Sequence, residues 1–223
     1  MLVLWETFRV ARSQINDSFP TSFNNTHRYE LVNNSCIRFS SVVKLLGINL
    51  DCCLTFDDHV KMLVSECFYH LWNIAKIKRY LFDTDAQKLI HAFISSKLDY
   101  SNAVLFGIKS SSLAKLQKVQ NYAARLAVGS SQTPISTVLE NLHWLNINQR
   151  IVFKLLLLTH KFFIGISPFY FCDLLLIKED SERLLHVKFM NTQCGRKSIS
   201  YAAPPTTEQH GTFWSRNQNY IIY

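Results

Sequence analysis

The segment from Ser110 to Gly129 most constrains the fold, because its apolar residues recur at the spacing of an α-helix. Ser110 or Ser111 is a suitable N-cap, and Gly129 suits the left-handed residue that often follows a helix. On a helix, six side chains share one face: Leu113, Leu116, Gln120, Ala123, Ala124 and Ala127. The segment therefore predicts a complete helix with one side in the core.

The opposite face of this predicted helix is basic and carries an aromatic ring. Lys115, Lys118, Tyr122 and Arg125 fall there, and no Asp or Glu occurs between residues 100 and 139. Cations interleaved with an aromatic residue are typical of a surface that contacts nucleic-acid phosphates. The pattern also fits an ordinary solvated helix face, and it leaves both interpretations open.

The composition favours a helical globular chain. Of the 223 residues, 48% are hydrophobic and 18% are charged, which excludes disordered and collagen-like chains. Six glycines and five prolines are few for a turn-rich β architecture, so helices are favoured. The net charge of +8 suits a polyanionic partner.

The cysteine pattern and the apolar runs indicate an intracellular protein, cytoplasmic or nuclear. The six cysteines form no C-x-x-C pair and no zinc-finger spacing with histidine, so we expect reduced thiols. The apolar run at the N-terminus is too short for a signal peptide. The most apolar segment, 151–166, contains Lys154, His160 and Lys161, which predicts a buried helix and no membrane association.

Taken in order, the chain predicts a mainly α fold. Residues 1–28 show little periodicity and are expected to be loop, whereas 29–56 contains β-branched runs around Asn33-Asn34 that predict a short antiparallel β element. Residues 57–176 predict a bundle of about five helices, the last of which begins at Asn146 or Asn148. The polar tail, 177–223, is expected to be poorly ordered.

Phe56-Asp57-Asp58 is the one motif that suggests a metal site, because polymerases hold divalent ions with adjacent carboxylates. Here the two acids open a long amphipathic pattern, where carboxylates are favoured as caps and by the helix dipole. The only aspartates available upstream as partners are Asp17, in a predicted loop, and Asp51, just before the same helix. We therefore expect no catalytic and no metal-binding residues.

No other catalytic motif is present in the sequence. It contains no G-x-S-x-G elbow, no P-loop and no dinucleotide fingerprint. His143-Trp144 next to Gln149-Arg150 is unusual in composition, and its expected role is structural. Trp144 is expected to lie between helices, with Arg150 capping a helix or pairing with an acid.

Several short strings, taken in order and with their spacing, resemble the C-terminal part of reverse transcriptases from non-LTR, LINE-type retrotransposons of the jockey group. They extend over about two thirds of the chain. They are VKLLGINLD at 43–51, LTFDDH at 54–59, KLDYSN at 97–102, LQKVQNYAARL at 116–126, LHWL at 142–145, QRI at 149–151 and PFY at 168–170.

This resemblance implies roles for particular regions. Residues 29–56 correspond to the end of the palm, where Leu46, Gly47 and Ile48 resemble a remnant of the primer grip. Residues 57–176 resemble the thumb, which grips an RNA–DNA hybrid, and Lys115, Lys118 and Arg125 match positions that face phosphates there. The family is an RNA-directed DNA polymerase that uses Mg²⁺.

The chain departs from the family in ways that change the expected function. The aromatic-x-Asp-Asp metal motif of the palm and its partner Asp are missing, so we expect no cofactor and no enzyme activity from this chain by itself. The family pattern also ends at Tyr201-Ala202-Ala203-Pro204. We expect a translated remnant of a mobile element with weak, non-sequence-specific affinity for nucleic acid. The alternatives are an inert remnant, or a helical protein-interaction module whose apolar face, uncovered by the missing palm, binds a protein partner.

Overall fold

The computed structural model describes residues 29–32, 35–38, 42–129, 132–177, 185–186, 189–192 and 195–210. The predictions made for residues 1–28, for the turn at 33–34 and for residues 211–223 lie outside this part. The chain divides into two compact units, residues 1–59 and 60–223, which are described separately. Among the described residues, no helix combines the length and the hydropathy that a bilayer crossing requires.

The first unit contains two antiparallel hairpins, which form two separate sheets. Strand β1 (Tyr29–Val32) pairs with β2 (Ser35–Arg38), and β3 (Val42–Leu45) pairs with β4 (Ile48–Asp51). Leu46 and Gly47 connect β3 to β4, and both have positive φ, 46° and 82°, as in the tight turns that suit twisted hairpins. The predicted antiparallel β element is therefore confirmed.

The Asp51 carboxylate organises the turn that leads from β4 into the first long helix, α2 (Asp57–Ile77). It accepts hydrogen bonds from the Thr55 and Phe56 backbone amides, at 2.9 and 2.8 Å, and from the Thr55 hydroxyl at 2.9 Å. Burial raises the pKa of Asp51, but these hydrogen bonds outweigh it and the net effect is a lowered pKa. Asp57 and Asp58 then lie in the first turn of α2, as helix-start residues should.

The rest of the described chain is mainly helical, which confirms the predicted fold class. The stretch from residue 83 to 99 contains a π-helical segment between two α-helices, and the Ser96 hydroxyl donates a hydrogen bond to the Ala92 carbonyl there. The elements after α2 are η1 (Lys78–Tyr80), α3 (Asp83–Ile90), η2 (His91–Ser95), α4 (Ser96–Asp99), η3 (Asn102–Leu105), α5 (Ser110–Val128), α6 (Ile135–Asn141), α7 (Ile147–Phe163), α8 (Phe171–Leu174), η4 (Gly195–Lys197) and α9 (Ile199–His210).

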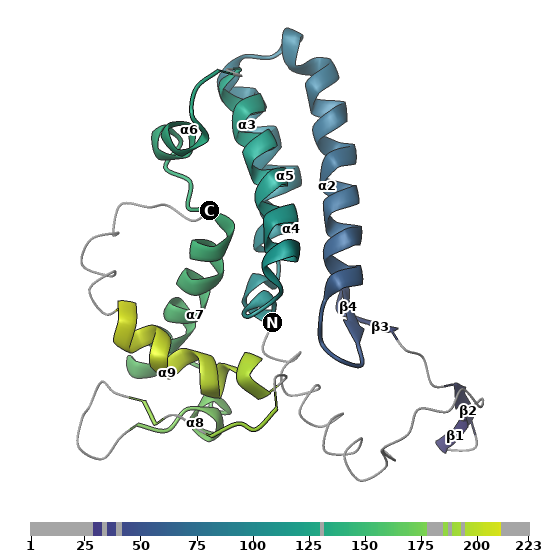
Figure 1. Ribbon diagram of the computed structural model, residues 1–223, viewed down its shortest axis with the longest axis vertical. Helices are drawn as coiled ribbons and strands as arrows, with labels where there is room; N and C mark the ends of the chain where they lie inside the picture. The colour runs from purple at the N-terminus through teal and green to yellow at the C-terminus, as the bar shows by residue number, and fades with distance from the viewer. Residues whose placement is uncertain are drawn as a thin grey trace. The chain divides into compact units, whose positions relative to one another are not determined.

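Helix α5 is central to the second unit, because it packs against α3, α6 and α7 (Figure 1). It begins at Ser110 with Lys109 at the N-cap and no side-chain cap bond, so neither predicted serine caps it. Gly129 ends it with φ +71°, as predicted. The inward face differs from the prediction: Leu113 is only half-buried. Neighbours on several sides cover a wider arc, which consists of Ser112, Leu116, Val119, Gln120, Ala123, Ala124 and Ala127.

Helix α9 lies within the segment for which the sequence predicts poor order, and the sequence did not predict this helix. It crosses α7 and packs against it (Figure 1), burying Ile199, Ala202 and Ala203. Pro204 and Pro205 inside the helix, together with a polar composition, argued against helical structure here. Small side chains allow close contact with α7, and this tertiary packing overrides the local preference.

Candidate nucleic-acid interface

The predicted basic residues all lie on the outer side of α5. Lys115 and Lys118 are exposed, Tyr122 is 47% exposed and Arg125 is half-buried. Their spacing of three or four residues places them in one row along the helix. The structure therefore brings these four side chains onto one face, opposite the buried Leu116, Ala123 and Ala127 positions.

A second helix extends this face. The Phe68 ring of α2 meets the Tyr122 ring of α5 edge to face, with the ring centroids 6.1 Å apart and the planes at 63°. Phe68 remains 40% exposed in this contact. The exposed sides of α2 and α5 are therefore adjacent at this point. Figure 1 shows the two helices running in nearly the same direction.

Helix α2 contributes an aromatic row that the sequence analysis missed. Trp72 lies one helical turn after Phe68 and is 58% exposed, and the Lys76 ammonium lies 3.1 Å from the centroid of the Trp72 ring. Exposed apolar side chains that form a contiguous patch mark interaction surfaces more often than ones that are scattered singly. We call this surface the α2–α5 face; it consists of Phe68, Trp72, Lys76, Lys115, Lys118, Tyr122 and Arg125.

The packing of α2 explains why these rings point outward. The opposite side of the helix contacts η2 and α4. Glu66 pairs with Lys97 of α4 at 2.5 Å, and the His70 ring stacks on the Phe93 ring of η2 with the centroids 5.3 Å apart. Cys67 and Leu71 are fully buried. The signal in the sequence was an excess of apolar positions: α2 has more of them than one buried stripe can accommodate.

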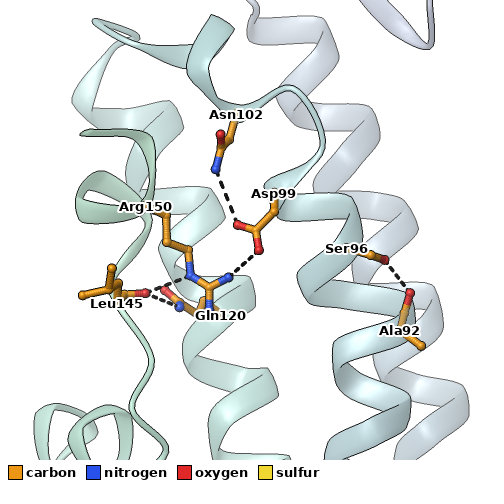
Figure 2. A network of polar contacts seen from close by, with 7 residues as sticks. All are labelled: Ala92, Ser96, Asp99, Asn102, Gln120, Leu145 and Arg150. Carbon is orange, nitrogen blue, oxygen red and sulfur yellow. Dashed lines mark hydrogen bonds and ion pairs between the residues drawn. The ribbon is translucent and has the colours of Figure 1, made fainter. Parts of the chain in front are cut away.

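A buried polar network lies on the inner side of α5 (Figure 2). The Leu145 carbonyl accepts hydrogen bonds from Gln120 Nε2 of α5 at 2.7 Å and from Arg150 Nε of α7 at 3.0 Å. Arg150 Nη1 also pairs with Asp99 Oδ2 at 2.8 Å, and Asn102 Nδ2 donates to Asp99 Oδ1 at 3.5 Å. The predicted pairing of Arg150 with an acid is thus confirmed, and Gln120 links α5 to this network on the side away from its exposed face.

Trp144 and His91 lie beside this network. Trp144 is buried, as predicted, and its ring contacts the His91 ring with centroids 5.1 Å apart. Burial lowers the pKa of His91, and the nearby Arg150 guanidinium lowers it further, whereas Asp99 acts in the opposite direction. A neutral imidazole is therefore favoured at this position in the folded chain.

The primer-grip-like residues occupy the β3–β4 hairpin. Leu46 and Gly47 form the turn, where Leu46 is 52% exposed, and Ile48 begins β4 with its side chain buried. They belong to the first unit. Their predicted role stays a prediction.

The acids that suggested a metal site do not converge in the part of the chain that is described. Asp57 and Asp58 lie in the first turn of α2, and the Asp51 carboxylate is engaged by Thr55 and Phe56. The described ranges contain no group of three or more His, Cys, Asp or Glu side chains that could hold a metal ion.

The strings that resemble reverse transcriptases fall on defined elements. The string at 43–51 spans the β3–β4 hairpin, the string at 116–126 lies within α5, and the string at 142–145 joins α6 to α7. Comparison of the chain with protein-family models, with curated proteins and with solved structures finds no match in any of the three.

Proposed function

We propose that this chain is the palm-end and thumb-like part of a non-LTR retrotransposon reverse transcriptase, and that it binds nucleic acid through the α2–α5 face without catalysing nucleotide addition. The contact between Phe68 and Tyr122 carries the proposal, because it joins an aromatic row on α2 to a basic row on α5. The ordered strings shared with that family support the same assignment.

The basic row on α5 suits the phosphates of a nucleic acid, and the aromatic row on α2 suits its bases. The Lys115, Lys118 and Arg125 side chains can neutralise backbone phosphates, and the exposed Trp72 ring offers a flat apolar surface. Phosphate contacts carry no sequence information, so the binding is expected to be non-specific. We expect it to occur inside the cell, in the cytoplasm or the nucleus, where the cysteines stay reduced.

The proposal includes no catalytic step. The Mg²⁺ ions of reverse transcriptases need carboxylates that converge. Asp57 and Asp58 instead start a helix, and Asp51 holds the turn before it. These residues do not fit the Mg²⁺ site, so we assign the chain only a binding role.

Fluorescence anisotropy with a labelled RNA–DNA hybrid, measured across a salt series, tests the binding. Each phosphate contact contributes about −0.9 to the slope of log affinity against log salt. The triple variant Lys115→Ala/Lys118→Ala/Arg125→Ala is therefore expected to have a slope shallower by about 3 than the wild-type chain. A matched control, Lys44→Ala/Lys88→Ala/Lys161→Ala, removes the same charge from exposed positions on other elements.

Two outcomes would contradict the proposal. The first is that a folded, monomeric wild-type sample does not bind the hybrid at low salt. The second is that both triple variants change the slope equally, which would show that net charge and not the α2–α5 face determines binding.

The alternative is a helical protein-interaction module. It is supported by apolar side chains exposed on and after the segment that joins α7 to α8: Ile166 is 71% exposed, and Phe169 and Phe189 are each 86% exposed. This alternative would be favoured if a folded sample does not bind the RNA–DNA hybrid but self-associates or binds a protein. The Phe169→Ser variant should then lose that association.

A further inference from the structure

The sulfur atoms of two neighbouring cysteines lie close together at the turn between β4 and α2. The Sγ atoms of Cys52 and Cys53 are 3.7 Å apart, and both residues are exposed. In an extended strand, adjacent side chains point to opposite faces and their ends diverge. The turn that follows Asp51 instead brings the two thiols to the same side.

The geometry of the pair favours shared ligation over an internal disulfide. Adjacent Cα atoms are about 3.8 Å apart across a trans peptide, which is shorter than the 4.4 Å or more that disulfides usually need. By contrast, two thiolates about 2.3 Å from one tetrahedral centre lie about 3.7 Å apart. The observed sulfur separation is therefore close to the one that two bonds to a single thiophilic centre require. A pyramidal trivalent centre has smaller bond angles than a tetrahedral one, so the two sulfur atoms would approach each other slightly on binding it.

We propose that Cys52 and Cys53 form a dithiol site for a thiophilic centre of the trivalent-arsenic class. Thiolates are soft ligands, and a centre of this class needs only two of them because it brings its own third substituent. This requirement matches the surroundings, since the described ranges contain no group of three or more potential ligand side chains. The described residues therefore do not provide the four protein ligands that a tetrahedral metal ion requires.

The reaction balances without an oxidant. An aryl arsenoxide exchanges its oxygen for two sulfur atoms, so that two As–S bonds form. The two thiol protons leave with the oxygen as one molecule of water. Arsenic remains trivalent, and a small dithiol can reverse the exchange.

Phenylarsine oxide added to the full-length chain in equimolar amount tests the site. Intact-mass measurement is expected to show one adduct per chain, and tryptic mapping should place it on the peptide of residues 45–61. That peptide contains Cys52 and Cys53 and no other cysteine. A small dithiol should remove the adduct, whereas a monothiol at the same concentration should not.

Cysteine-to-serine variants test whether binding requires both thiols of the pair. Cys52→Ser and Cys53→Ser are each expected to weaken binding at least about 100-fold, because the second thiol of a chelate acts at a high effective concentration. Cys172→Ser removes another exposed cysteine and should bind as the wild-type chain does. The proposal is overturned by the absence of an adduct, by an adduct on another peptide, or by undiminished binding in Cys52→Ser. The mapping uses the wild-type chain, so it decides the question even where a variant fails to fold.

Discussion

The Arg150 guanidinium lies where only 10% of the side chain is exposed, and its partner Asp99 is only 18% exposed. Removing two charges from water costs several kcal/mol each, and good geometry has to compensate for this cost. Here the guanidinium donates hydrogen bonds to the Asp99 carboxylate and to the Leu145 carbonyl, which also accepts one from Gln120. The network therefore depends on every member being present.

Substitution of Arg150 is expected to destabilise the fold strongly. Arg150→Met should lower the free energy of unfolding by about 3 kcal/mol, because the half-buried Asp99 carboxylate loses its charged partner. Urea denaturation measures the change. Lys88→Met serves as the control, since it breaks an exposed pair with Asp85 and should cost less than about 0.5 kcal/mol. Equal losses in the two variants would contradict the role of the network.

The His91 side chain predicts how stability depends on pH. Its pKa is lowered on folding, by burial first and by Arg150 second, so the unfolded chain binds the proton more readily. The full stability from this group is present above the unfolded pKa of about 6.5, and it declines as the pH falls below that value towards the folded pKa. Urea denaturation at a series of pH values should show His91→Gln losing less stability on acidification than the wild-type chain. Identical pH profiles would exclude this contribution.

At the scale of elements, the N-terminus of α7 shows how far the local sequence can predict where a helix begins. The sequence left Asn146 and Asn148 as alternative caps for the last predicted helix. The structure selects Asn146, whose side chain accepts a hydrogen bond from the Gln149 amide while the Gln149 side chain accepts one from the Asn146 amide. Gln117 of α5 also accepts a hydrogen bond from the Ile147 amide at 2.9 Å, so a neighbouring helix contributes to the cap.

The two asparagines are predicted to respond differently to the same change. Asn146→Ala removes the cap and should lower the free energy of unfolding by about 1 kcal/mol. Asn148→Ala replaces an exposed residue inside α7 and should be neutral or stabilise the chain by a few tenths of a kcal/mol. Thermal denaturation of both variants beside the wild-type chain measures the difference. A larger loss in Asn148→Ala would contradict the assigned helix start.

At the scale of the whole molecule, the second unit is closed by a contact between segments far apart in sequence. Helix α9 packs on α7 through small side chains, and Ala202 is only 1% exposed there. This contact is long-range, and its stability comes from burial and not from the local preference of α9. Two prolines within α9 make the helix dependent on that support.

A charge introduced into this contact should disrupt it. Ala202→Asp places an unpaired carboxylate between α9 and α7 and is expected to lower the free energy of unfolding by about 3 kcal/mol. The same substitution at exposed Ala114 of α5 should change it by no more than about 0.5 kcal/mol. Urea denaturation compares the two. If the variants are equally stable, α9 does not contribute to the packing of the second unit.

Much of the fold was predictable because its signals are local. The course and the C-terminal end of α5 followed from apolar spacing and from Gly129, and an antiparallel β element followed from the β-branched runs. The outward row of Lys115, Lys118 and Tyr122 followed from the same helical period. The π-helical segment at His91–Ser95 was not predicted, since it depends on contacts that its own sequence does not reveal.

By itself, the sequence determined where α5 ends, which of its sides is basic, and that helices dominate the chain. Only the tertiary structure decided that Phe68 and Trp72 point outward, that Arg150 pairs with Asp99 across 51 residues, and that α9 forms. The physical reason is that helical periodicity and capping act within a few residues. Which apolar side of a helix is covered, and which buried charge finds a partner, depends on elements that only folding brings together.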